Sequence, residues 1–128
     1  VEVEEGNPRY PYKPPVPLTV IINPTLEPVG DEAIEINEGC LSVPDLRGNL
    51  ERHMAVRVRY LDREGTEHEE TKRGLTAGTF QHEVDHLDGV LFVDRADPRS
   101  FATWDQFDRH QRDEFLHRVA RINEEAGS

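Results

Sequence analysis

The order of hydrophobic and polar residues predicts several short strands in the first part of the chain. Residues 18–22 are a β-branched apolar run that ends at Asn-Pro, which favours a buried strand. Residues 33–37 alternate apolar and polar positions, as a half-buried strand does. Residues 54–61 repeat that alternation, and a turn at 62–65 leads into a polar strand at 66–72, which predicts a hairpin. The buried face of the 54–61 strand is expected to carry Val56, Val58 and Tyr60.

A change of period predicts a helix at residues 76–88. Its apolar residues recur every three or four positions and form one stripe, made of Ala77, Phe80, Val84 and Leu87. Gly89 follows at the position where a helix commonly has its C-terminal cap. We expect this amphipathic helix to be central to the domain, and residues 90–93 to form a short strand after it.

The two ends of the chain have different patterns. Residues 97–125 predict a C-terminal helix with Pro98 in its first turn. Its broken apolar face, which we expect to pack on the body of the domain, carries Trp104, Phe107, Phe115, Val119 and Ile122. Residues 1–17 hold five of the nine prolines and predict an irregular connector, because proline lacks an amide donor. The whole pattern favours an α+β fold, with short antiparallel strands around the central helix.

Composition narrows the class of protein. A length of 128 residues predicts a single domain over residues 1–128. The formal net charge is −11, which disfavours binding to nucleic acid or to an anionic membrane surface. No apolar run approaches the roughly 18–20 residues of a membrane span. One cysteine excludes an intrachain disulfide and fits a reducing compartment, so we expect a cytoplasmic protein.

The strongest chemical signal is the run His82-Glu-Val-Asp-His86 inside the predicted helix. Residues four apart project from the same face of a helix, so both imidazoles can bind one divalent metal. Glu83 follows the first histidine and is placed to act as a general base on a water molecule at the metal. The sequence therefore predicts a metal site on this helix.

A catalytic metal site needs a third protein ligand and one open position. The candidates are Cys40, the carboxylates and the remaining histidines, His53, His68, His110 and His117. The four histidines are expected to be solvated. Cys40 differs because a thiolate is a strong ligand for a divalent metal and the preceding Gly39 allows close approach of the backbone. Asp85 is a candidate for a hydrogen bond to His82.

Two motifs together resemble the peptide deformylase family. They are Glu38-Gly-Cys-Leu-Ser42 and Gln81-His-Glu-Val-Asp-His-Leu-Asp-Gly89, and the resemblance extends over residues 17–95. It implies that Cys40, His82 and His86 hold the metal and that Glu83 is the general acid and base. It also implies that the Leu41 amide helps to stabilise the oxyanion, while Glu38, Gly39 and Arg47 shape the peptide-binding cleft.

The resemblance also implies a reaction and its cofactor. The family removes the formyl group from N-formylmethionyl peptides and releases formate. It uses ferrous iron (Fe2+) in cells and accepts Zn2+, Ni2+ or Co2+. Some members dock on the ribosome through their terminal helix, but residues 101–123 are locally neutral, and we expect that helix to pack on the domain instead.

One family motif is missing from the sequence. Members carry an upstream Gly-x-Gly-x-Ala-Ala-x-Gln segment whose glutamine is a second oxyanion donor, and residues 1–17 contain nothing similar. We expect that the chain lacks its N-terminal portion. The alternatives are that a separate polypeptide supplies the motif or that the protein is weakly active.

Two other functions stay open on the sequence alone. A His-Glu-x-x-His metallopeptidase shares the helical motif, but it leaves the Glu38-Gly-Cys context unexplained. A non-catalytic metal-binding fragment would use the metal only to hold the fold. Oligomeric state and side-chain preference beyond methionine are not specified by the sequence.

Overall fold

The computed structural model of the chain describes residues 1–8 and 10–127. Arg9, within the predicted connector, and Ser128 lie outside the described residues. The elements follow in the order β1 (Ile22–Pro28), β2 (Ala33–Cys40), β3 (Val43–His53), β4 (Ala55–Leu61), β5 (Glu67–Arg73), α1 (Gly74–Leu87), α2 (Phe92–Arg95), the 3-10 turn η1 (Pro98–Ser100), α3 (Trp104–His110) and α4 (Arg112–Ala126).

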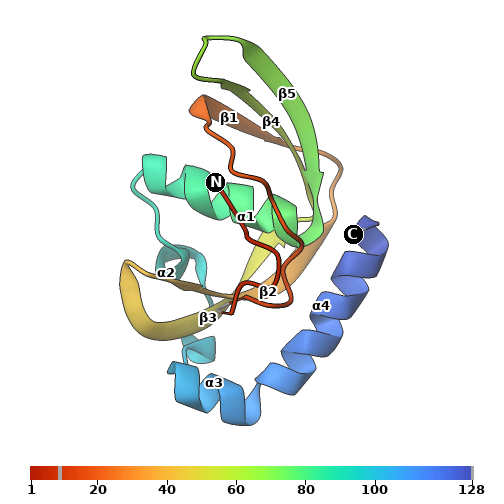
Figure 1. Cartoon of the computed structure of the whole chain (residues 1–128). Helices are drawn as coiled ribbons and strands as arrows, with labels where there is room; N and C mark the ends of the chain where they lie inside the picture. The colour runs from red at the N-terminus through yellow and green to blue at the C-terminus, as the bar shows by residue number, and fades with distance from the viewer. Residues whose placement is uncertain (9, 128) are drawn as a thin grey trace.

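The strands form two antiparallel sheets. One has the order β1-β4-β5, and the other is the hairpin β2-β3. Figure 1 shows α1 between the three-stranded sheet and the β2-β3 hairpin, with α4 along one side of the molecule. The α+β fold predicted from the sequence is therefore confirmed. None of the helices within the described residues is both long enough and apolar enough to span a bilayer.

The predicted alternation in β4 is confirmed. Val56, Val58 and Tyr60 are buried, and they pack with Ala77 and Phe80 of α1. Each buried valine contributes about 1.5–3 kcal/mol relative to an exposed one, so this face attaches the sheet firmly to α1. Two residues of the N-terminal segment join the same cluster, where a bridge pairs Val3 with Val16.

The helix α4 covers the other side of α1. Its buried residues Phe115, Val119 and Ile122 pack against a cluster that includes Ile36 of β2 and Leu75 of α1. The packing predicted for the C-terminal helix is thus confirmed. Close approach requires a small residue at Gly74, where φ is +65° and an added Cβ would lie 2.7 Å from the Cβ of Ala126.

Some predicted element boundaries were wrong. The first strand begins at Ile22 instead of spanning 18–22, and β2 continues to Cys40. The strand β3 was not predicted, because its residues 43–53 are mostly polar and lack a clear alternation. On α1, Leu87 is 67% exposed, so the predicted apolar stripe ends one turn earlier.

Residues 90–93 do not form the predicted strand. Phe92 instead begins the short helix α2, in which the Asp94 carboxylate accepts a hydrogen bond from the Leu91 N–H at 2.9 Å. A carboxylate in this position satisfies a backbone donor that the first helical turn leaves open.

The predicted helix over residues 97–125 is divided into η1, α3 and α4. Ala102 forms a two-way backbone bridge with Arg47 of β3, which holds the chain extended before α3. Thr103 then caps α3 by accepting a hydrogen bond from the Gln106 N–H. At Gln111 the backbone leaves helical geometry again, with φ at −125°.

Candidate metal centre

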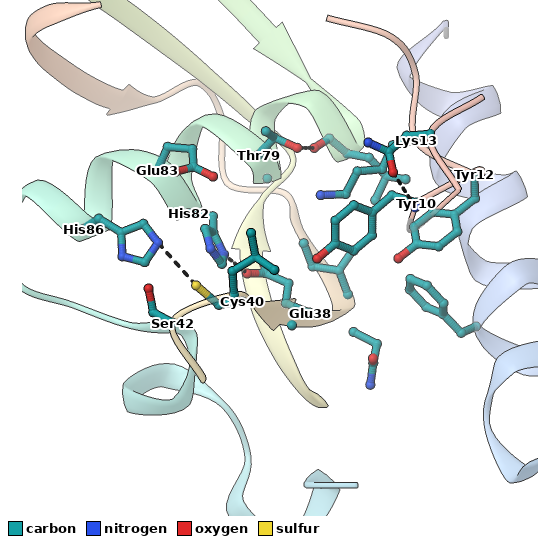
Figure 2. Close-up of a pocket in the computed structure, with 18 residues that line it drawn as sticks. Tyr10, Tyr12, Lys13, Glu38, Cys40, Ser42, Thr79, His82, Glu83 and His86 are labelled. Atoms are coloured by element: carbon teal, nitrogen blue, oxygen red, sulfur yellow. Dashed lines mark hydrogen bonds and ion pairs between the residues drawn. The ribbon is translucent and has the colours of Figure 1, made fainter. Parts of the chain in front are cut away.

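Three predicted ligands lie together where the end of β2 meets α1. Cys40 is the last residue of β2, and His82 and His86 are one turn apart on α1. The Cys40 Sγ lies 3.6 Å from the His86 Nε2, and the three ligand atoms lie within 4.8 Å of one another. Figure 2 shows the thiol facing both imidazoles, with Glu83 on the same helix nearby.

The donor set fits a divalent transition metal. A thiolate and two imidazoles suit zinc and iron among others, and three protein ligands leave one position open for water or substrate. Within the described residues, this is the one group of three such side chains close enough to share an ion. The other four histidines, His53, His68, His110 and His117, do not belong to it.

Glu38 holds His82 in place. The Glu38 carboxylate is buried on β2, and its Oε1 lies 2.7 Å from the His82 Nδ1. Burial alone raises the pKa of Glu38, but hydrogen bonds from Arg52 and His82 outweigh it and lower this pKa to about 2. An ionised carboxylate can only accept, so the His82 Nδ1 carries the proton and Nε2 is left as the ligand atom.

Arg52 is a site residue that the sequence reasoning missed. It donates to both Glu38 oxygens at 2.8 and 2.9 Å and to the Asp85 carboxylate at 2.7 Å. Asp85 also accepts hydrogen bonds from Arg95 and does not make the predicted bond to His82. Arg52 lies opposite Ile34 in the β2-β3 register. It could be placed near Glu38 from the sequence only if β3 and this register had been predicted.

The metal ligands are electrostatically coupled. Burial raises the pKa of the Cys40 thiol, but hydrogen bonds from the Ser42 backbone and from His82 lower it overall. Burial lowers the pKa of His82, but Glu38, Cys40 and Glu83 together raise it overall. The two shifts have opposite directions, and each favours the charged form of its group.

Arg47 does not lie in the pocket wall. It is 1% exposed, and its guanidinium stacks on the rings of Trp104 and Phe107 at 4.4 and 4.3 Å. It donates to Asn37 and to the Tyr12 hydroxyl, and both of those residues line the pocket. Arg47 therefore supports the wall from behind, and Glu38 pairs with Arg52 instead of with Arg47.

A pocket of about 480 Å³ adjoins the ligand cluster. Besides the three predicted ligands, four predicted site residues line it, namely Glu38, Gly39, Leu41 and Glu83. Leu41 is 82% exposed. The N-terminal segment contributes four lining residues that were not predicted from the sequence, Asn7, Tyr10, Tyr12 and Lys13. Figure 2 shows Tyr10, Tyr12 and Lys13 on the side of the pocket away from His86.

Gln81 has a structural role that spacing did not reveal. Its side-chain oxygen accepts from the His53 N–H at 3.0 Å, and its amide donates to the His53 carbonyl at 2.9 Å. These two bonds attach α1 to the end of β3, so the ligand helix is fixed relative to the hairpin that carries Cys40.

Comparison with known proteins gives relatives of one kind. Residues 1–102 match the family model described as polypeptide deformylase. Peptide deformylase 2 of a Nostoc species is 50% identical over 91 residues, which cover 71% of this chain and 51% of the relative. Peptide deformylase 1 of Prochlorococcus marinus is 50% identical over 96 residues, or 74% and 50% of the two chains. The chain spans about half the length of the curated relatives it matches.

Solved structures agree with the sequence relatives. A Met-Ala-Ser-bound class I type b peptide deformylase from Acinetobacter baumannii matches with a TM-score of 0.65 and 47% identity, over 70% of this chain and 56% of that one. A peptide deformylase from Synechococcus elongatus in complex with actinonin matches with a TM-score of 0.60 and 33% identity, over 89% and 52%. Because the family model covers most of its length, the chain belongs to the peptide deformylase family.

Proposed function

We propose that this chain removes the N-formyl group from formylmethionyl peptides and releases formate. The observation that carries the proposal is the Cys40/His82/His86 cluster beside a pocket that Glu83 also lines. Cys40, His82 and His86 would hold the metal, which we propose to be Fe2+, with Zn2+, Ni2+ or Co2+ able to replace it. When bound, a divalent cation supplies Lewis-acid polarisation of a carbonyl oxygen and acidifies a water ligand.

Glu83 is proposed to move the proton. Glu83 lines the pocket beside His82 and His86 on the same helix. Within the described residues, its carboxylate takes part in no ion pair. It can therefore accept the proton of the attacking water and later deliver it to the departing amine. The backbone N–H of Leu41 is proposed to donate to the developing oxyanion.

Three further residues are proposed to orient the reacting groups. Glu38 fixes the tautomer of His82 and so the direction of its ligand nitrogen. Gly39 lines the pocket, and an added Cβ there would lie 3.4 Å from both the Leu46 carbonyl oxygen and the Trp104 ring, so we propose that it keeps its backbone close to both. Arg47 acts from behind the wall by holding Asn37 and Tyr12.

A methionyl peptide is the proposed substrate. A related structure from Acinetobacter baumannii is described as bound to Met-Ala-Ser, a peptide that begins with methionine. The pocket of this chain combines the apolar side chains of Ile36, Leu75 and Phe115 with the polar groups of the cluster. That mixture suits a thioether side chain next to a polar reacting bond.

The metallopeptidase alternative is disfavoured by the third ligand. Such an enzyme needs a further histidine or glutamate near the helical pair, whereas the group found here is completed by Cys40. The cysteine lies in the Glu38-Gly-Cys motif, which the family membership explains.

We propose that the chain acts on newly made polypeptides in the cytoplasm. The helix α4 carries Asp113, Glu114, Glu124 and Glu125 against Arg112, Arg118 and Arg121, so it has one more acidic than basic residue. This acidic excess disfavours docking of α4 on ribosomal RNA. Cosedimentation of the chain with ribosomes at low salt measures ribosome association directly.

Formate release tests the proposal. The 128-residue chain is loaded anaerobically with Fe2+ or with Ni2+ and given formyl-Met-Ala-Ser, beside its Glu83→Ala variant. We expect turnover in the parent chain and a rate about 10²–10⁴-fold lower in the variant, because general acid–base catalysis typically accelerates a reaction by that factor. One equivalent of bound metal without formate release would make the chain a metal-binding fragment. Cleavage inside the peptide would favour the metallopeptidase.

A further inference from the structure

Lys13 is a pocket residue that the proposed reaction leaves unused. It belongs to the N-terminal segment and lines the same pocket as Glu83 and the metal ligands. Figure 2 shows it beside Tyr10, away from His86. Its ammonium lies 4.4 Å from the centre of the Tyr10 ring, a cation–π distance that fixes the end of this flexible side chain.

The Lys13 ammonium lacks a counter-ion. Across residues 1–8 and 10–127, no carboxylate lies within ion-pairing distance of it. Burial lowers the pKa of Lys13, although the charges of Glu38 and Glu83 oppose that effect. Glu38 is already bonded to Arg52 and His82 and cannot turn towards Lys13. A partly desolvated cation without an anionic partner is unfavourable, and an anion entering the pocket lowers that cost.

The other lysine of the chain provides a contrast. Lys72 lies over the ring of Phe80, and its ammonium is 3.5 Å from the Glu70 carboxylate. It is therefore paired within the fold, and it does not line the pocket. The lack of an anionic partner at Lys13 is therefore a property of its place in the pocket, which Lys72 does not share.

We propose that Lys13 binds a carboxylate of the peptide substrate, so that the pocket favours peptides with an acidic group close to the formylmethionine. This inference rests on the proposed deformylase function. The carboxylate can belong to an Asp or Glu side chain after the methionine or to the C-terminus of a short peptide, since both present the same oxygens. A single negative charge fits better than a phosphate, because Glu38 and Glu83 also lie in the pocket.

Matched peptides test this role. Nickel-loaded chain is given formyl-Met-Glu-Ala and formyl-Met-Gln-Ala, each with an amidated or a free C-terminus. The variants are Lys13→Met, Lys13→Arg and, as the matched control, Lys72→Met. We expect the parent chain to prefer the peptide with the added carboxylate by about tenfold in kcat/KM, the size of one charge-assisted hydrogen bond. Lys13→Met should lose the preference, while Lys13→Arg and Lys72→Met should retain it.

A binding measurement separates this proposal from the deformylase function. Titration calorimetry with the unformylated peptides Met-Glu-Ala and Met-Gln-Ala reports the same preference without any turnover. A preference that Lys13→Met abolishes supports the anion contact even where no formate is released. If the preference in affinity requires the Glu side chain, the bound carboxylate is that of the side chain. If it requires the free C-terminus, the bound carboxylate is the terminal one. Equal affinities in the parent chain, or an equal loss for both peptides in Lys13→Met, would overturn the proposal.

Discussion

At the scale of single residues, the metal centre depends on Glu38. This carboxylate joins a ligand histidine to Arg52, and Arg52 continues the chain of hydrogen bonds to Asp85. Removing one member of such a buried network leaves an uncompensated charge, which typically costs about 3–5 kcal/mol. The direction in which His82 presents its Nε2 is therefore set by residues outside the predicted ligand set.

The low pKa of Glu38 predicts a specific pH dependence of stability. Its folded pKa is about 2 and its ordinary value is 4.5, so its ionised form is favoured by folding. This contribution is fully present above pH 4.5 and is lost as the pH falls from 4.5 towards 2. We expect the free energy of unfolding of the metal-free chain to exceed that of Glu38→Gln at pH 6, and the difference to shrink at pH 3.

Urea unfolding at the two pH values measures this difference. Glu27→Gln is a suitable control, because Glu27 is exposed and its closest contact with Arg57 is 3.7 Å. The control should change the free energy of unfolding by less than about 0.5 kcal/mol at either pH. A difference between parent and Glu38→Gln that stays constant from pH 6 to pH 3 would contradict the low pKa.

At the scale of elements, α1 and β4 could be predicted and β3 could not. The helix has a clear apolar period and a glycine after its end, and β4 alternates strictly. By contrast, β3 is a long strand whose buried positions include Arg47, Gly48 and Arg52, so its hydrophobic pattern is hidden. The motifs name Cys40, His82 and His86, which the fold brings together, whereas Arg52 and Lys13 come into place only through tertiary contacts.

The junction of α1 and α4 provides a test of this packing. Gly74 and Gly89 both have positive φ, +65° and +75°, but only at Gly74 would an added Cβ meet another helix. Alanine is strained at both positions, and at Gly74 it also collides with Ala126. We expect Gly74→Ala to lower the free energy of unfolding by about 1–3 kcal/mol more than Gly89→Ala in urea titrations. Equal losses would show that the ends of the two helices are not in contact.

At the scale of the whole molecule, the cluster connects parts of the chain that are far apart in sequence. Cys40 belongs to the β2-β3 sheet, and the two histidines belong to the helix that follows the other sheet. A cation bound by all three ligands is therefore expected to stabilise the folded domain as a unit. This coupling acts only on the folded state, because the unfolded chain does not hold the ligands together.

Thermal unfolding can measure this coupling. At a Ni2+ concentration of one hundred times Kd, mass action adds about 2.7 kcal/mol, which should raise the Tm on the order of 10 °C. We expect Cys40→Ser to lose most of this increase and a chelator to reverse it in the parent chain. His117→Ala, which changes a histidine outside the cluster, should keep the full increase. An increase of equal size in Cys40→Ser would place the ion elsewhere.

The packing of α4 also has a consequence for the order in which the chain folds during synthesis. Ile34 and Ile36 pack against Phe115, Val119 and Ile122. These three residues are synthesised about eighty residues after the isoleucines and leave the ribosome correspondingly later. Until then the sheet that bears Cys40 has an open apolar face, although α1 with both histidines has already emerged. We expect the hairpin that presents Cys40 to become firmly packed, and the nascent chain to hold its cation tightly, only after α4 has emerged.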